Sequence, residues 1–354
     1  MRPVITACLL FGVTLLLYGY RLTDAPVSPQ ERQVLVAAAS GSGPLFFQVS
    51  GEDWLQPGAV YLTAAARHIG GGDASARLAT VIVAAINIAL VFLCARRVFA
   101  SRLAGALAPL LLLATPAHIM FGRSGTDALF TIPFVLLWLL ALLCHWESGT
   151  TGSIIAAGAA LGAGVYMNRA APLTMGFLLM LSVATLIGNG RSWRSVWMIV
   201  SAFGAWLLPA AAWFALHQET YPDTFGRWAV FLAHIRNPID GVRAFVNWNT
   251  LGSRASLYWG FLDPAWLFFE NMLLLVMLPL LVAGAAMWRR VLTRPSMTLI
   301  AGGALVAPLA GSSFGAPHYA QDALAFLPCA ILLMSAGIAG LQQWFSAPVR
   351  RSGA

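Results

Sequence analysis

Apolar runs long enough to cross a bilayer recur along the whole chain, at 78–95, 103–121, 128–144 and 272–287. A membrane-spanning helix needs roughly 20 such residues. Only 10% of the 354 residues are charged, whereas soluble domains carry about 25% and can cover a water-facing surface. A membrane barrel would instead show short segments of alternating polarity. The sequence therefore predicts an all-α polytopic membrane protein, folded as one domain over residues 1–354.

The apolar pattern predicts about ten transmembrane helices. Their expected boundaries are 4–20, 76–98, 103–121, 127–146, 152–168, 170–188, 194–216, 266–288, 296–314 and 323–343. Two long connections, 21–75 and 217–265, are expected to lie on the membrane surface as juxtamembrane helices and turns. The first should contain a short helix over 30–39 and a second helix that begins at Pro57 and stops at the glycine triplet 70–72.

The charges are distributed so that alternate loops differ sharply in sign. With a cytoplasmic N-terminus, the inner loops hold 11 of the 21 arginines and only one of the 13 acids, Glu147. This asymmetry follows the positive-inside rule, and the reverse orientation would violate it. The sequence thus predicts a multi-pass plasma (inner) membrane protein with both termini cytoplasmic and both long loops external. The net charge of +8 is then a topology signal, and no nucleic-acid partner is needed to explain it.

A succession of short motifs is similar to the GT-C membrane glycosyltransferases. The motifs are, in order, Arg21-Leu22 followed by Gln30-Glu31, WLQPGAVYL (54–62), SARLATVIVAAINIALVFLCARRVFA (75–100), TPAHIMFGRSGTDAL (115–129), YWGFLDPAWLFFEN (258–271) and APHYAQDALAFLP (316–328). The chain resembles the family 39-like branch, which includes the protein O-mannosyltransferases, the lipid A aminoarabinose transferase and the lipopolysaccharide-core galacturonosyltransferases. In that branch an acidic pair usually stands where this chain has Gln30-Glu31, and an arginine is common where it has Gln321.

The resemblance implies a GT-C fold and an enzyme that transfers a sugar from a polyprenyl-phosphate donor. The acceptor would be an envelope lipid, glycan or protein, and the reaction would invert the anomeric carbon on the external face. Such chemistry needs a carboxylate that accepts the acceptor's hydroxyl proton. It also needs cations that stabilise the charge developing on the leaving phosphate.

The carboxylates of the first long loop are the candidates for the catalytic base. Glu31 is the first choice because of its position in the motif, with Glu52 and Asp53 in reserve and Gln30 as a substrate contact. The competing structural interpretation is that Glu31 is a solvated loop acid in the first turn of a helix, where acids are favourable.

Four further residues are expected to contact substrate: Arg123, Asp127, Arg169 and His318. Arg123 and Asp127 stand four residues apart, so a helical ion pair is the alternative interpretation. His318 could equally be structural. No metal site and no cofactor other than the lipid-linked donor is predicted, although carboxylates from separate loops could converge on a divalent cation.

Two other functions remain open from the sequence. A transporter or flippase for a lipid-linked sugar would favour charges at mid-bilayer depth and repeated halves. A catalytically degenerate partner protein would be consistent with Gln30 in place of the usual acid.

Overall fold

The computed structural model describes residues 3–24, 26–40, 47–48, 54–218, 239–240, 248–270, 272–313 and 320–346, and within these ranges it is almost entirely helical. The longer helices are α1 (Pro3–Gly19), α2 (Pro29–Ala39), α3 (Pro57–Ala66), α4 (Ser75–Val98), α5 (Arg102–Leu113), α7 (Ile132–Ser148), α8 (Thr151–Gly164), α9 (Ala171–Gly188), α10 (Trp193–Leu216), α13 (Trp248–Leu262), α15 (Leu278–Val291), α16 (Arg294–Gly311) and α18 (Leu327–Ser346). The shorter elements are α6 (Pro116–Phe121), α14 (Pro264–Phe269), α17 (Ala320–Ala323), a π-helical turn (Arg67–Gly71) and three 3₁₀ turns (Gly72–Ala74, Leu275–Met277 and Leu324–Phe326). Two short strands, β1 (Phe47–Gln48) and β2 (Trp54–Leu55), pair antiparallel.

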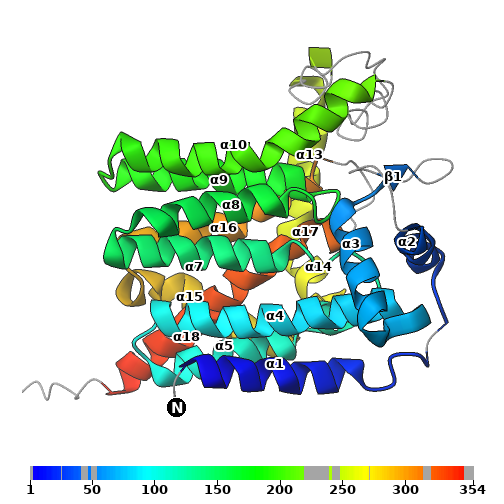
Figure 1. Ribbon diagram of the computed structural model, residues 1–354. Helices are drawn as coiled ribbons and strands as arrows, with labels where there is room; N and C mark the ends of the chain where they lie inside the picture. The colour runs from blue at the N-terminus through cyan, green and yellow to red at the C-terminus, as the bar shows by residue number, and fades with distance from the viewer. Residues whose placement is uncertain are drawn as a thin grey trace, which may run out of the picture.

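The long helices lie side by side in one bundle (Figure 1). Glycines bring neighbouring helices close at two seams, as is common where helices pack in a membrane. Gly158 and Gly162 lie one turn apart on α8, and a side chain there would collide with Ile199 and Trp206 of α10. Gly284 of α15 packs in the same way against the backbone of α18. These glycines therefore let α8 pack closely on α10, and α15 on α18.

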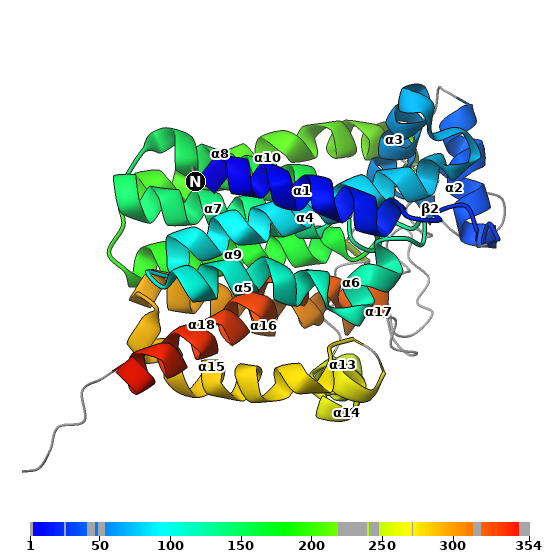
Figure 2. The same ribbon diagram turned by 90° about the horizontal axis from the view of Figure 1, so that it is seen from below.

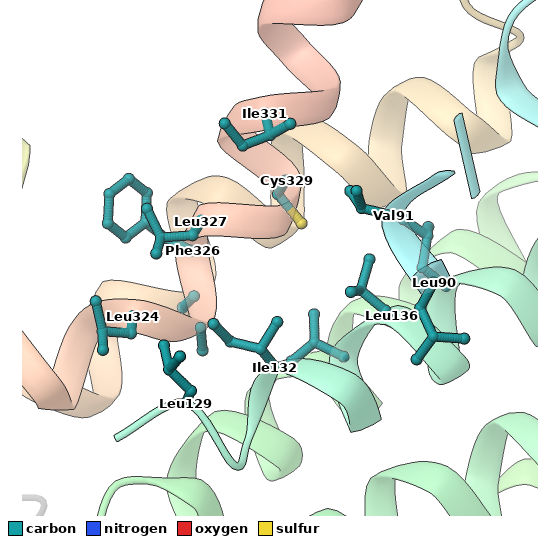
Figure 3. Close-up of a cluster of buried hydrophobic side chains, with 14 of the residues drawn as sticks. Leu90, Val91, Leu129, Ile132, Leu136, Leu324, Phe326, Leu327, Cys329 and Ile331 are labelled. Carbon is teal, nitrogen blue, oxygen red and sulfur yellow. The ribbon is translucent and has the colours of Figure 1, made fainter. Parts of the chain in front are cut away.

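The centre of the bundle is a cluster of buried aliphatic side chains from helices that are distant in the sequence. Figure 3 shows Leu90 and Val91 of α4 with Leu136 of α7, beside Cys329 and Ile331 of α18. All of these side chains are at least nine-tenths buried. This cluster fixes α18 against the first half of the chain.

Every one of the ten predicted spans contains helix, but their lengths differ from the prediction. Among the described residues, four helical stretches are long and apolar enough to cross a membrane: Gly72–Val98, Ala171–Gly188, Trp193–Leu216 and Ala320–Ser346. Four shorter helices are also apolar: Pro3–Gly19, Arg102–Leu113, Ile132–Ser148 and Thr151–Gly164. The number of ten crossings thus stays a prediction.

Three predicted boundaries were wrong. The span 103–121 is interrupted, because Thr115 precedes Pro116 and adopts an extended backbone that separates α5 from α6. The span 127–146 begins as helix only at Ile132, after a run of turns. The span 266–288 is divided between α14 and α15. The predicted short helices were correct: α2 covers 29–39, α3 starts at Pro57, and its extension ends at the glycine triplet.

The two ends of the bundle have different character. Helices α2 and α3 lie across one end, and α13 and α14 lie at that end too (Figures 1 and 2). At the opposite end Arg97 forms an ion pair with Glu147, and the Arg191 guanidinium lies 4.6 Å from the centre of the Trp146 ring. The loops predicted to share a side of the membrane therefore meet at the same end of the bundle.

Candidate functional site

A buried ion pair fastens the first long connection to the bundle. Arg77, in the first turn of α4, lies with its Nε 2.8 Å from Glu31 Oε1, and its Nη2 donates a 2.9 Å hydrogen bond to Oε2. The same guanidinium donates to the backbone oxygens of Leu22 and Pro26, each at 2.8 Å. The side chains of Arg77 and Glu31 are only 6% and 1% exposed. Arg77 thus binds the connection between α1 and α2 as well as the first turn of α2, and it fixes both to α4.

Glu31 also completes the start of α2. Its backbone N–H donates to Ser28 Oγ at 3.1 Å, and the Ser28 N–H donates to the Glu31 carboxylate at 3.3 Å. This reciprocal pair is a capping box. The alternative interpretation of Glu31 as an acid in the first turn of a helix is therefore correct, but the carboxylate is buried and not solvated, because Arg77 of α4 binds it. The local sequence does not reveal this partner.

Arg123 terminates the first helix instead of pairing with Asp127. Its Nη2 donates to the backbone oxygen of Tyr20 at 2.7 Å, and the Arg21 oxygen lies at 3.4 Å. A cation at a helix C-terminus is favourable because it meets unpaired carbonyls and the negative end of the helix dipole. Arg21 itself has φ +51°, which among the described residues is the one positive φ outside glycine. The i,i+4 ion pair is thus not formed, since residues 122–131 are turns and not helix.

The connection 122–131 packs closely against the buried Glu31–Arg77 ion pair. Gly125 adopts φ +67°, and a Cβ placed there would lie 2.9 Å from Glu31 Cδ. Only glycine combines this backbone conformation with so close an approach. Gly122 packs in a similar way against the Tyr18 ring. Arg123 and Asp127 are therefore carried by a turn whose position depends on α1 and on Glu31.

A second ion pair joins the short turn after α8 to the short helix α17, which precedes α18. Arg169 binds Asp322 in a bidentate fork, with Nε to Oδ1 at 2.8 Å and Nη2 to Oδ2 at 2.6 Å. The Asp322 side chain is 3% exposed, and the Arg169 side chain is 33% exposed. Asn168 fixes the turn, since its Oδ1 accepts hydrogen bonds from the N–H groups of Ala170 and Ala171. The guanidinium is therefore held rigidly with part of its surface open.

Asp127 lies between the two ion pairs. Its side chain is half-buried, and its carboxylate accepts a hydrogen bond from its own backbone N–H. Burial, which is the largest cause, and the negative charge of Asp322 together raise the pKa of Asp127 from 3.8 to about 7, although Arg169 and the backbone hydrogen bond act in the opposite direction. These influences place Asp127 within electrostatic reach of the Arg169–Asp322 pair. A carboxyl with a pKa near neutrality is suited to proton transfer.

Four predicted site residues remain: Gln30, Glu52, Asp53 and His318. Gln30 is exposed in the first turn of α2. Glu52, Asp53 and His318 lie outside the described residues. Within the part of the chain that the structure describes, no three histidine, cysteine or acidic side chains come together as a possible metal site.

Three residues of the group were not among the predicted site residues: Arg77, Gly125 and Asp322. Arg77 and Asp322 each stand at the edge of an apolar stretch, where a charge requires a partner. That signal could have predicted that each is paired, but not with which residue. Gly125 carried no signal, because its role comes from a contact with a residue 94 positions earlier.

Comparisons with known proteins agree with the motif resemblance. Residues 56–215 match the family model described as dolichyl-phosphate-mannose-protein mannosyltransferase. No curated protein matches the sequence of the whole chain. Two solved structures of ArnT from Cupriavidus metallidurans are similar. The form bound to undecaprenyl phosphate shows 20% identity and a TM-score of 0.60, covering 95% of this chain and 59% of ArnT. The apo form shows 18% identity and a TM-score of 0.58, covering 95% of this chain and 58% of ArnT.

These matches confirm the predicted resemblance to the GT-C glycosyltransferases and establish the fold. The chain spans about three fifths of the length of ArnT. The matched family segment runs from Gln56 to Ala215 and so includes Arg77, Asp127 and Arg169.

Proposed function

We propose that the protein is a membrane glycosyltransferase that moves a sugar from a polyprenyl-phosphate carrier to an envelope acceptor. The observation that carries this proposal is the half-buried carboxyl of Asp127 beside the fixed Arg169 guanidinium, at the end of the bundle where the long connections meet. A proton acceptor beside a cation is the pair of groups that displacement of a phosphate by a hydroxyl requires. The ArnT form with bound undecaprenyl phosphate supports a lipid-phosphate donor by similarity of fold.

Asp127 is the proton acceptor in this proposal, in place of Glu31. A base must reach the hydroxyl that it deprotonates, and the Glu31 carboxylate is 1% exposed and already bound by Arg77. Asp127 is more accessible, and its pKa near 7 leaves it able both to accept and to release a proton. The acceptor oxygen then bonds to the anomeric carbon while the bond from that carbon to the phosphate oxygen breaks. The polyprenyl phosphate leaves, and the configuration at the anomeric carbon inverts.

Arg169 is the group that we assign to the donor phosphate. Its bidentate bond to Asp322 fixes the guanidinium plane, and a fixed cation need not reorganise as charge develops. Arginine is well suited to phosphate because its donors form a planar fork. Glu31, Arg77 and Arg123 are then positioning residues, which hold the turn that carries Asp127.

A lipid-linked sugar transporter is the competing function. It would place its charged groups near mid-membrane depth, along the path of the sugar. In the described helices the paired charges Glu31, Arg77, Arg169 and Asp322 instead gather at one end of the bundle. This distribution favours chemistry at one membrane face over passage between faces.

The test is a comparison of cells with and without the gene, using analysis of lipid-linked sugars together with mass spectrometry of envelope glycans. The proposal predicts accumulation of a polyprenyl-phosphate sugar and loss of one sugar from an envelope component when the gene is absent. Unchanged donor and unchanged glycans would contradict it. Donor trapped on the cytoplasmic leaflet, with transfer restored by membrane permeabilisation, would support the transporter.

A further inference from the structure

Four arginines form a patch at the end of the bundle opposite the candidate site. The patch, here called the arginine patch, consists of Arg102 at the start of α5, Arg289 and Arg290 at the end of α15, and Arg294 at the start of α16. All four side chains are exposed. The C-terminal part of α18 lies among them, because Ser101 donates a 2.6 Å hydrogen bond to Gln342 and Met287 packs against Gly340.

No acidic residue balances this patch. The four helices that form it, α5, α15, α16 and α18, contain no aspartate or glutamate in their described residues. None of the four guanidinium groups has a hydrogen bond or ion pair with another described residue. At the same end, Arg97 does have an acidic partner in Glu147. The positive charge of the arginine patch is therefore left unneutralised by the protein.

The helix dipoles favour a positive charge at two of the four positions in the patch and disfavour it at the other two. Arg289 and Arg290 stand in the last turn of α15, where a cation is favourable. Arg102 and Arg294 are instead the first residues of their helices, where a cation meets the positive end of the dipole and is unfavourable. Helix electrostatics therefore do not favour these two positions, and a bound anion would offset their unfavourable interaction with the helix dipoles.

Exposed aromatic rings border the patch. Trp344 and Phe345 at the end of α18 are 61% and 75% exposed. Such rings favour the headgroup level of a bilayer. An arginine cluster beside rings of this kind matches a layer that offers phosphate next to hydrocarbon.

We infer that the arginine patch binds the headgroups of anionic phospholipids in the leaflet that surrounds this end of the bundle. Each guanidinium can hold phosphate oxygens through two parallel hydrogen bonds. The inference concerns the end away from Asp127 and is independent of the proposed transfer reaction.

The test uses the full chain, purified in a neutral detergent and titrated with phosphatidylglycerol or with phosphatidylcholine, following bound lipid by native mass spectrometry. The variant Arg102→Gln/Arg294→Gln removes two patch charges from positions where the change relieves the helix dipole, so it is expected to fold. Arg32→Gln/Arg67→Gln is the matched control, because both of its arginines are exposed at the other end.

We expect selective binding of phosphatidylglycerol that salt weakens. The patch variant should bind this lipid about 30-fold more weakly, since each of the two interfacial arginines contributes roughly fivefold. The control variant should bind as the unmodified protein does. Equal binding of the two lipids would overturn the inference, and so would an unchanged phosphatidylglycerol affinity in Arg102→Gln/Arg294→Gln. Displacement of the lipid by millimolar inorganic phosphate would identify an adventitious anion site and would also overturn it.

Discussion

Removal of Arg77 should destabilise the protein far more than removal of an arginine from an exposed pair. In Arg77→Met the Glu31 carboxylate stays 1% exposed but loses its cation, and the oxygens of Leu22 and Pro26 lose their donor. Breaking a buried pair in this way costs about 3–5 kcal/mol. The pair Arg97–Glu147 is the internal control, because its side chains are 42% and 51% exposed. Arg97→Met should cost about 0–1 kcal/mol.

A double variant separates the pairing from other effects of the substitution. Arg77→Met/Glu31→Gln removes both charges, so neither is left buried alone. We expect it to lose less stability than the sum of the single variants, by about 1–3 kcal/mol. Chemical unfolding in detergent micelles, followed by tryptophan fluorescence, measures the stability of Arg77→Met, Glu31→Gln, their double variant and Arg97→Met. The reasoning fails if Arg77→Met and Arg97→Met cost the same, or if the two Arg77 and Glu31 changes are simply additive.

The other predictions concern the turn between α6 and α7. Gly125→Ala should destabilise the protein by about 1–2 kcal/mol through its left-handed backbone, with more from the approach to Glu31; a normal unfolding midpoint would contradict this. Arg123→Ala should lower stability by about 1 kcal/mol, because the C-terminal cap of α1 is lost. Adding Arg21→Gly to this variant should restore part of the loss, because glycine adopts φ +51° without strain. If stability were not restored, the capping role would be refuted. Transfer should rise with pH through about 7 as Asp127 loses its proton. Because folding raises the pKa of Asp127 from 3.8 to about 7, the stability of the fold should decrease as the pH rises from about 4 to about 7 and level off above that. A flat pH profile of transfer would exclude Asp127 as the base.

The sequence was sufficient for the fold class because hydropathy reports burial and span length directly. All ten apolar segments contain helix, α3 begins at Pro57 as predicted, and α2 begins one residue before the predicted Gln30. Boundaries failed where turns replaced helix: residues 127–131 were predicted to begin the span 127–146, yet they are turns and the helix starts only at Ile132.

The roles of the site residues stay predictions, but the structure shows which of them lie together and which partners they have. The motif positions selected Glu31, Arg123, Asp127 and Arg169, which the structure finds at one end of the bundle. The partner of each charge could not be predicted, because Arg77 meets Glu31 across 46 residues and Arg169 meets Asp322 across 153. Pairing decides whether a carboxylate is available for chemistry, so a sequence pattern alone could not separate Glu31 from Asp127.

The most direct test of the account is sugar transfer by Asp127→Asn, measured as turnover of a polyprenyl-phosphate sugar per folded protein in membranes from cells that lack the native gene. Asp73→Asn, an exposed carboxylate at the same end of the bundle, is the control. Loss of a general base lowers the rate by about 10²- to 10⁴-fold, so Asp127→Asn should show that loss while Asp73→Asn keeps near-normal turnover. Near-normal turnover by well-folded Asp127→Asn would contradict the account and assign the proton transfer to another residue.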